Sequence, residues 1–95
     1  MRPYEVVVVL NPNLEEEPLE ALITKFQELI TGNGGEIVKT DKWGKRKLAY
    51  EIDGHTEGFY VVIDFQSESN AATELERVLK ITDEVIRHLL VRTDE

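Results

Sequence analysis

Apolar residues recur along the first third of the chain with two different periods. A run rich in β-branched residues at 4–10 is bounded by Pro3 and by Asn11-Pro12-Asn13, which predicts a buried strand. Leucine, isoleucine and phenylalanine then recur every three or four residues over 19–30, as on one stripe of an amphipathic helix. The chain is therefore expected to begin with a strand and a helix.

The remaining two thirds predict two strands, a second helix and a last strand. Apolar residues alternate with polar ones within 36–52 and 59–65, and Asp53-Gly54 predicts the turn that joins these strands. A second helical stripe covers 71–79, and a strand at 85–91 ends the pattern. This last strand does not alternate cleanly, so the pattern leaves open which way its side chains face.

The residues that begin the two helices allow more than one interpretation. Asn13 with Glu16 matches an N-cap and its reciprocal partner, whereas proline, here Pro18, is favoured at a first helical position. The first helix is therefore expected to begin either after Asn13 or at Pro18. For the second helix, Ser67 or Ser69 is the expected cap.

The order of elements, β-α-β-β-α-β, predicts an α+β fold, the ferredoxin-like sandwich, in a single domain over 1–95. Its four-stranded antiparallel sheet would have the spatial order 4-1-3-2, with both helices on one face. The layer facing the helices is expected to contain Val6, Val8, Leu10, Val61, Ile63 and Phe65. The other face would present Val7, Val9, Tyr60 and Val62, and an uncovered apolar face suggests a partner.

Composition narrows the class of protein further. The 95 residues include no cysteine and no apolar run near the 20 or so needed to cross a bilayer, so we expect a cytoplasmic protein without a membrane partner. The formal net charge is −8, which by itself argues against nucleic acid. The charges are unevenly spread, however: acids dominate 13–36 and bases dominate 39–47.

The sequence lacks the residue combinations that catalysis or metal binding needs, so we expect no enzyme, no metal, no cofactor and no small-molecule substrate. His55 and His88 are the only histidines, and neither has a partner at ligand spacing. An acyl phosphatase of this fold would need an arginine in the loop at 11–17, which instead holds three glutamates. The segment 57–64 also fails most positions of the aromatic motif by which this topology stacks RNA bases.

The distinctive segment is Trp43-Gly44-Lys45-Arg46-Lys47-Leu48-Ala49-Tyr50. Gly44 interrupts the strand, as glycines at bulges do. Three consecutive cations beside an indole suit phosphate oxygens, with the ring free to pack on a sugar, a base or a partner. The segment equally suits an exposed strand whose charges discourage edge pairing. Composition alone does not choose between these two interpretations.

Taken together with other blocks, this segment resembles the bacterial small-subunit ribosomal protein S6 family over nearly the whole chain. The blocks that carry the resemblance are Met1-Arg2, Tyr4-Glu5, Asn11-Pro12, Trp43-Gly44-Lys45-Arg46, Leu48-Ala49-Tyr50, Val85-Ile86-Arg87 and Val91-Arg92-Thr93. The resemblance implies a ferredoxin-like fold and a structural role in the small ribosomal subunit. It also implies binding to the central domain of small-subunit ribosomal RNA, as a heterodimer with the small basic ribosomal protein S18.

The RNA contacts that the resemblance implies are Arg2, Tyr4, Lys45, Arg46, Lys47, Arg87 and Arg92, with Trp43 as a partner contact. We expect Arg2, Arg87 and Arg92 to form one cluster and the cations at 45–47 another on the opposite edge strand. The hypothesis calls for a continuous positive zone. The alternative is a ferredoxin-like regulatory or ligand-binding domain that self-associates through its sheet.

Overall fold

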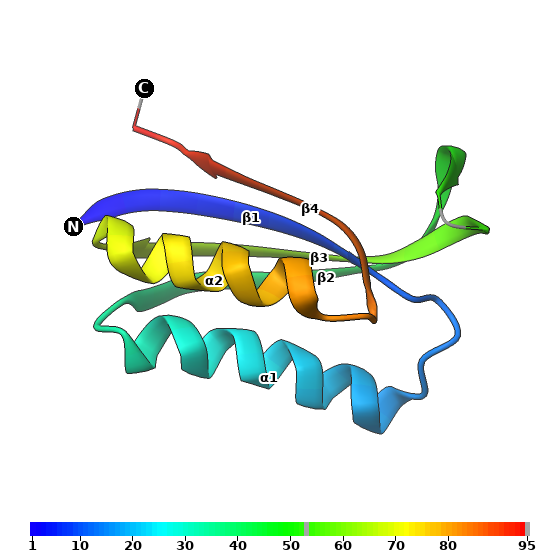
Figure 1. The fold of residues 1–95 in the computed structure, drawn as a ribbon, viewed down its shortest axis with the longest axis horizontal. Coiled ribbons are helices and arrows are strands. Elements are labelled where there is room, and N and C mark those ends of the chain that lie inside the picture. The colour runs from blue at the N-terminus through cyan, green and yellow to red at the C-terminus, as the bar shows by residue number, and fades with distance from the viewer. Residues whose placement is uncertain (53, 95) are drawn as a thin grey trace.

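A computed structural model, which describes residues 1–52 and 54–94, contains a four-stranded antiparallel sheet with two helices on one face (Figure 1). The strands are β1 (Arg2–Leu10), β2 (Glu36–Ile52), β3 (His55–Ser67) and β4 (Val85–Arg92). The helices are α1 (Glu16–Gly32) and α2 (Ser69–Ile81). The strand order is β2-β3-β1-β4, which confirms the predicted order with β2 and β4 at the edges.

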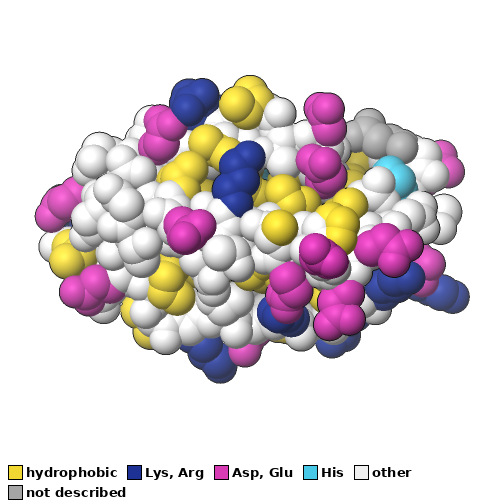
Figure 2. Space-filling view, turned by 90° about the horizontal axis from the view of Figure 1, so that it is seen from below, with side chains coloured by type: hydrophobic (Ala, Val, Ile, Leu, Met, Phe, Trp, Pro, Cys, Tyr) yellow, Lys and Arg dark blue, Asp and Glu magenta, His cyan; other side chains and the backbone are white. Residues whose placement is uncertain are grey.

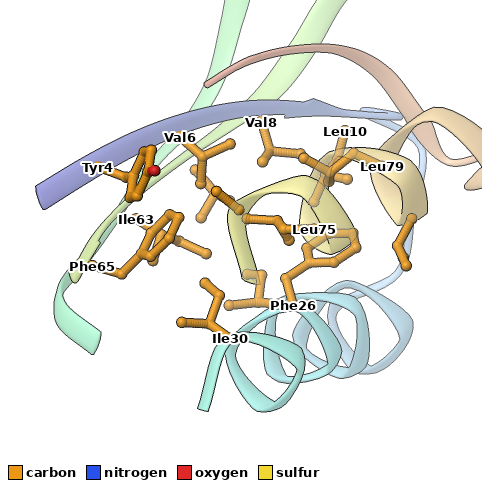
Figure 3. Close-up of a cluster of buried hydrophobic side chains, with 14 of the residues drawn as sticks. Tyr4, Val6, Val8, Leu10, Phe26, Ile30, Ile63, Phe65, Leu75 and Leu79 are labelled. Carbon is orange, nitrogen blue, oxygen red and sulfur yellow. The ribbon is translucent and has the colours of Figure 1, made fainter. Parts of the chain in front are cut away.

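The core lies between the sheet and the helices, as predicted. Val6, Val8 and Leu10 of β1 pack with Ile63 and Phe65 of β3, and all are at most 1% exposed. Figure 3 shows Phe26 and Ile30 of α1, and Leu75 and Leu79 of α2, pointing into the same cluster. All six residues predicted to face the helices belong to this core.

Both helices begin differently from the prediction. α1 begins at Glu16 after an extended Glu15, and no side chain caps it. The Asn11 side chain instead accepts a hydrogen bond from the Asn13 backbone N–H at 2.9 Å. Pro18 is the third helical residue, where a backbone N–H has no intrahelical acceptor in any case, so the proline costs no hydrogen bond.

The predicted caps of α2 are also wrong. α2 follows an extended Glu68 and likewise has no side-chain cap. Ser67 is fully buried, and its hydroxyl donates to the Glu68 carbonyl at 2.9 Å, which directs it away from the helix N–H groups.

A bulge in β2 confirms the interpretation of Gly44. Lys42 lies opposite Val61 and Gly44 lies opposite Tyr60, so Trp43 is the extra residue on β2. Gly44 has φ +83°, in the left-handed region that glycine tolerates best. Gly54 has φ +81°, whereas Asp53 of the predicted turn lies outside the described residues.

Beyond the third register break between β2 and β3, after Lys47, the end of the hairpin turns away from the two helices (Figure 1). Tyr50 lies on this end, and its hydroxyl accepts a hydrogen bond from Arg87 of β4 at 3.2 Å. The hairpin end and β4 therefore meet on the side of the sheet that carries no helix.

Candidate nucleic-acid interface

The face of the sheet opposite the helices, called here the open face, is largely apolar. Directly opposite residues of antiparallel strands share a face, so the pairs Val7–Val62 and Val9–Tyr60 lie here. The same rule places Leu89 of β4 beside Val7 on the open face, where it is 56% exposed. A groove of about 150 Å³ runs over this area, lined by Val7, Val9, Tyr60, Arg87, His88 and Leu89.

One end of the open face is acidic. Glu5 of β1 lies directly opposite Asp64 of β3. Burial, repulsion from the Asp64 carboxylate and a hydrogen bond with it raise the pKa of Glu5 above its usual value. Asp41 of β2 lies on the same face and pairs with Lys39 at 3.3 Å. This arrangement suits a cationic partner and disfavours RNA phosphates.

The cations of the distinctive segment lie at the other end of the sheet, on edge strand β2. Lys45, Arg46 and Lys47 are all exposed, opposite Phe59, Gly58 and Glu57 of β3 respectively. Within the described residues, none of the three takes part in a salt bridge, in contrast to Lys42, which pairs with Glu20 of α1. Their charges are therefore available to an anionic ligand.

Trp43 contacts both the sheet and Arg46. Its ring stacks on Tyr60 with centroids 6.2 Å apart and an interplanar angle of 11°. The guanidinium carbon of Arg46 lies 5.8 Å from the Trp43 ring centroid, within the range of a cation–π interaction. The indole is nevertheless half exposed, so it lies at the border between the apolar open face and the cations.

Arg2 and Arg92 lie together at the opposite corner of the molecule. Arg92 donates to both carboxylate oxygens of Asp94, at 3.0 and 2.9 Å. The hydrogen bonds from Arg92, together with the charges of Arg92 and Arg2, lower the pKa of Asp94. The Thr93 N–H donates to the Pro3 carbonyl at 3.0 Å, so the two chain ends lie side by side.

Arg87 does not join that cluster, contrary to expectation. It lies opposite Val9 whereas Arg92 lies opposite Tyr4, which places the two arginines about 17 Å apart along β4. They also face opposite sides of the sheet because five residues separate them. Arg87 instead shares the end of the sheet that carries Lys45, Arg46 and Lys47, and these four residues are called here the cationic end.

The expected continuous zone is therefore divided, with Arg46 and Arg87 at one end of the sheet and Arg2 and Arg92 at the other.

Tyr4 differs from the other predicted RNA contacts because it belongs to the core. It is 8% exposed and stacks on Phe65 with ring centroids 5.4 Å apart. Figure 3 shows its ring among the core residues, where little of it is accessible to RNA.

Acidic residues dominate elsewhere. Glu15, Glu16 and Glu17, at the beginning of α1, are all exposed. Figure 2, which views the molecule from below, shows Asp and Glu side chains spread over much of that side. The surface is thus divided between an acidic helical side and the cationic end of the sheet.

Sequence reasoning missed the Glu5–Asp64 pair. Each acid lies beside apolar strand residues and by itself resembles an ordinary exposed position. Only the register of β1 on β3 brings the two acids together. The alternation within each strand was the available signal, since it places both residues on the face away from the helices.

In residues 1–52 and 54–94, no three histidine, aspartate or glutamate side chains converge in a way that would hold a metal ion. No helix in the same residues has the length and apolar character that a membrane span requires.

Comparison with known proteins gives a consistent result. The sequence profile of the family described as "Ribosomal protein S6" matches residues 3–92. The chain is 56% identical to the small ribosomal subunit protein bS6 of Thermoanaerobacter pseudethanolicus over 95 residues, covering 100% of both chains. It is 55% identical to that of Heliobacterium modesticaldum, covering 100% of this chain and 99% of the relative.

A solved structure is similar as well. The crystal structure of 30S ribosomal protein S6 from Thermotoga maritima superposes with a TM-score of 0.92 at 36% identity, covering 97% of this chain and 87% of that one.

Proposed function

Because this chain belongs to the ribosomal protein S6 family, it is a structural protein of the bacterial small ribosomal subunit and not an enzyme, and we propose that it binds there jointly with a partner. It binds the central domain of small-subunit ribosomal RNA together with the small basic ribosomal protein S18. As part of the bacterial ribosome, it works in the cytoplasm.

The observation that carries the RNA contact is the cationic end. Lys45, Arg46 and Lys47 project from an edge strand without a salt bridge to any described residue, and Arg87 lies at the same end of the sheet. Cations placed this way neutralise phosphates and release the counterions condensed on RNA. Arg2 and Arg92, at the opposite corner, are proposed as a second and separate contact.

The open face is the proposed contact with S18. It combines the apolar groove with the Glu5–Asp64 pair, and so offers both hydrophobic burial and negative charge to a basic protein. Trp43, half exposed at its border, is the proposed partner contact nearest the RNA. A protein with a net charge of −8 repels RNA on its own, whereas a basic companion offsets that field.

Self-association through the open face is the competing function. A two-fold dimer would place the same patch on both sides of the interface. The acids Glu5 and Asp64 would then lie in an interface with their own copies. Sedimentation of the purified chain is expected to show a monomer, and a stable dimer that resists salt would favour this competing function.

The RNA contact is tested with a fragment of the central domain, titrated with the chain, with S18 and with both. We expect weak binding by the chain alone and tight binding by the pair. Arg46→Glu should weaken joint binding about 10- to 100-fold, since charged hydrogen bonds contribute about 1.5–3 kcal/mol. Lys25→Glu makes the same charge change on the exposed surface of α1 and should have little effect. Equal RNA affinity with and without S18 would refute the cooperative mechanism.

The S18 contact is tested separately, without RNA. Leu89→Glu places a charge on the open face and should weaken S18 binding at least about 10-fold, because a leucine side chain loses its burial. Ile81→Glu is the matched control, since Ile81 is 66% exposed at the end of α2. Equal losses for both variants would argue against docking on the open face.

A further inference from the structure

The bulge in β2 places Trp43 and Arg46 on one face of the sheet. Residues three apart in a regular strand point to opposite faces, because side chains alternate. The extra residue at the bulge changes this alternation, so Trp43 stacks on Tyr60 of the open face and Arg46 lies opposite Gly58 of the same face. Gly44 makes the bulge possible through its φ of +83°.

Two successive contacts link the sheet to the guanidinium of Arg46. Tyr60 belongs to β3, a central strand paired on both sides, and its ring stacks on that of Trp43. The Trp43 ring in turn lies 5.8 Å from the guanidinium carbon of Arg46. None of the salt bridges among the described residues involves Arg46, so the Trp43 ring is the group that restrains its guanidinium.

We propose that Trp43 is a positioning residue, which holds the Arg46 guanidinium in the orientation that accepts an RNA phosphate. This inference rests on the proposed RNA contact and adds a role for Trp43 that differs from direct contact with a partner. An arginine side chain loses rotamer freedom when it binds a phosphate. A ring that already restrains the guanidinium reduces that loss and leaves its N–H donors free at the edge.

The proposal predicts that the two residues act as a unit. In RNA binding by the chain with S18, Arg46→Ala should cost about 10-fold or more in the wild-type background. In a Trp43→Leu background the same change should cost less than about 2-fold, because the unrestrained arginine contributes little. Trp43→Phe keeps a ring and should retain most of the effect of Arg46.

Two further measurements separate positioning from general structural damage. The log-log salt slope of RNA binding should become less steep by about 0.9 in both Arg46→Ala and Trp43→Leu, as one phosphate contact is lost. Trp43 is the only tryptophan in the chain, so its emission should change on Arg46→Ala in the free protein. Lys25→Ala is the control in both backgrounds, and thermal unfolding checks that each variant is folded.

Additive losses in the double-mutant cycle would overturn the proposal, since they would mean that Trp43 contacts RNA directly or acts independently. Unchanged tryptophan emission on Arg46→Ala would also overturn it. If the wild-type chain together with S18 does not bind RNA, the proposed function itself is refuted, so this result is distinguishable from the additive losses.

Discussion

Gly58 of β3 has no Cβ, and the packing around it leaves no space for one. A Cβ built there would lie 2.2 Å from Cγ1 of Val9, which is 3% exposed and has little room to move. Gly58→Ala should therefore destabilise the protein by about 1–3 kcal/mol, the usual cost of overpacking.

Urea denaturation measures this effect, with Gly32→Ala as the control. Gly32 ends α1 and has no neighbouring atom within 4 Å of a Cβ, so alanine there should be neutral or stabilise by about 0.4–1 kcal/mol. If Gly58→Ala is as stable as wild type, β1 and β3 can move apart locally to accommodate the added methyl group beside Val9.

The Glu5–Asp64 pair makes stability depend on pH. Because the pKa of Glu5 is raised in the folded protein, the folded state binds a proton more tightly than the unfolded state. The stabilisation from Glu5 is complete below the usual glutamate pKa and is lost as pH rises through the higher folded value. Glu5→Gln removes this loss, so its melting temperature relative to wild type should increase between pH 4 and pH 7.

The control for this experiment is Glu28→Gln, which removes a glutamate charge from the exposed surface of α1. A melting-temperature difference for Glu5→Gln that stays constant or falls with rising pH would contradict the raised pKa that burial and Asp64 give Glu5.

At the scale of elements, the bulge in β2 connects backbone conformation with function. Gly44→Ala forces a side chain into a left-handed conformation at a cost of about 1–2 kcal/mol. Gly34, with φ +88° and equally open surroundings, should lose a similar amount when changed to alanine. Only Gly44→Ala should also alter Trp43 emission and weaken RNA binding, which fluorescence and RNA titration measure. Equal emission from the two variants would mean that the bulge does not determine the Trp43–Arg46 contact.

Elements with strong patterns were predictable from sequence, and their ends were not. The predicted strand at 36–52 matches β2, because alternation and flanking glycines mark it. The beginning of α1 was missed because the Asn11 side chain, and not a cap, organises the preceding turn. Such local hydrogen bonds compete with capping, and the sequence alone does not show which one forms.

At the scale of the whole molecule, the sheet order followed from topology, whereas the grouping of charges did not. The predicted neighbours β1 and β4 are adjacent, yet Arg87 and Arg92 of the same strand lie at different ends of the sheet. The register of β4 on β1 decides this, and β4 lacks the clean alternation that would have indicated its facing. The grouping of the candidate residues on the surface was therefore not predictable from the sequence, and their binding roles stay predictions.

The central position of β1 also affects how the chain matures. β1 is the first strand to leave the ribosomal tunnel, but it lies between β3 and β4, and Tyr4 pairs with Arg92 near the end of the chain. Its apolar run from Val6 to Leu10 can pair with β3 once that strand has emerged, whereas its other edge stays unpaired until β4 follows. A nascent chain that stalls before β4 therefore exposes one edge of β1, and an unpaired strand edge of this kind favours aggregation.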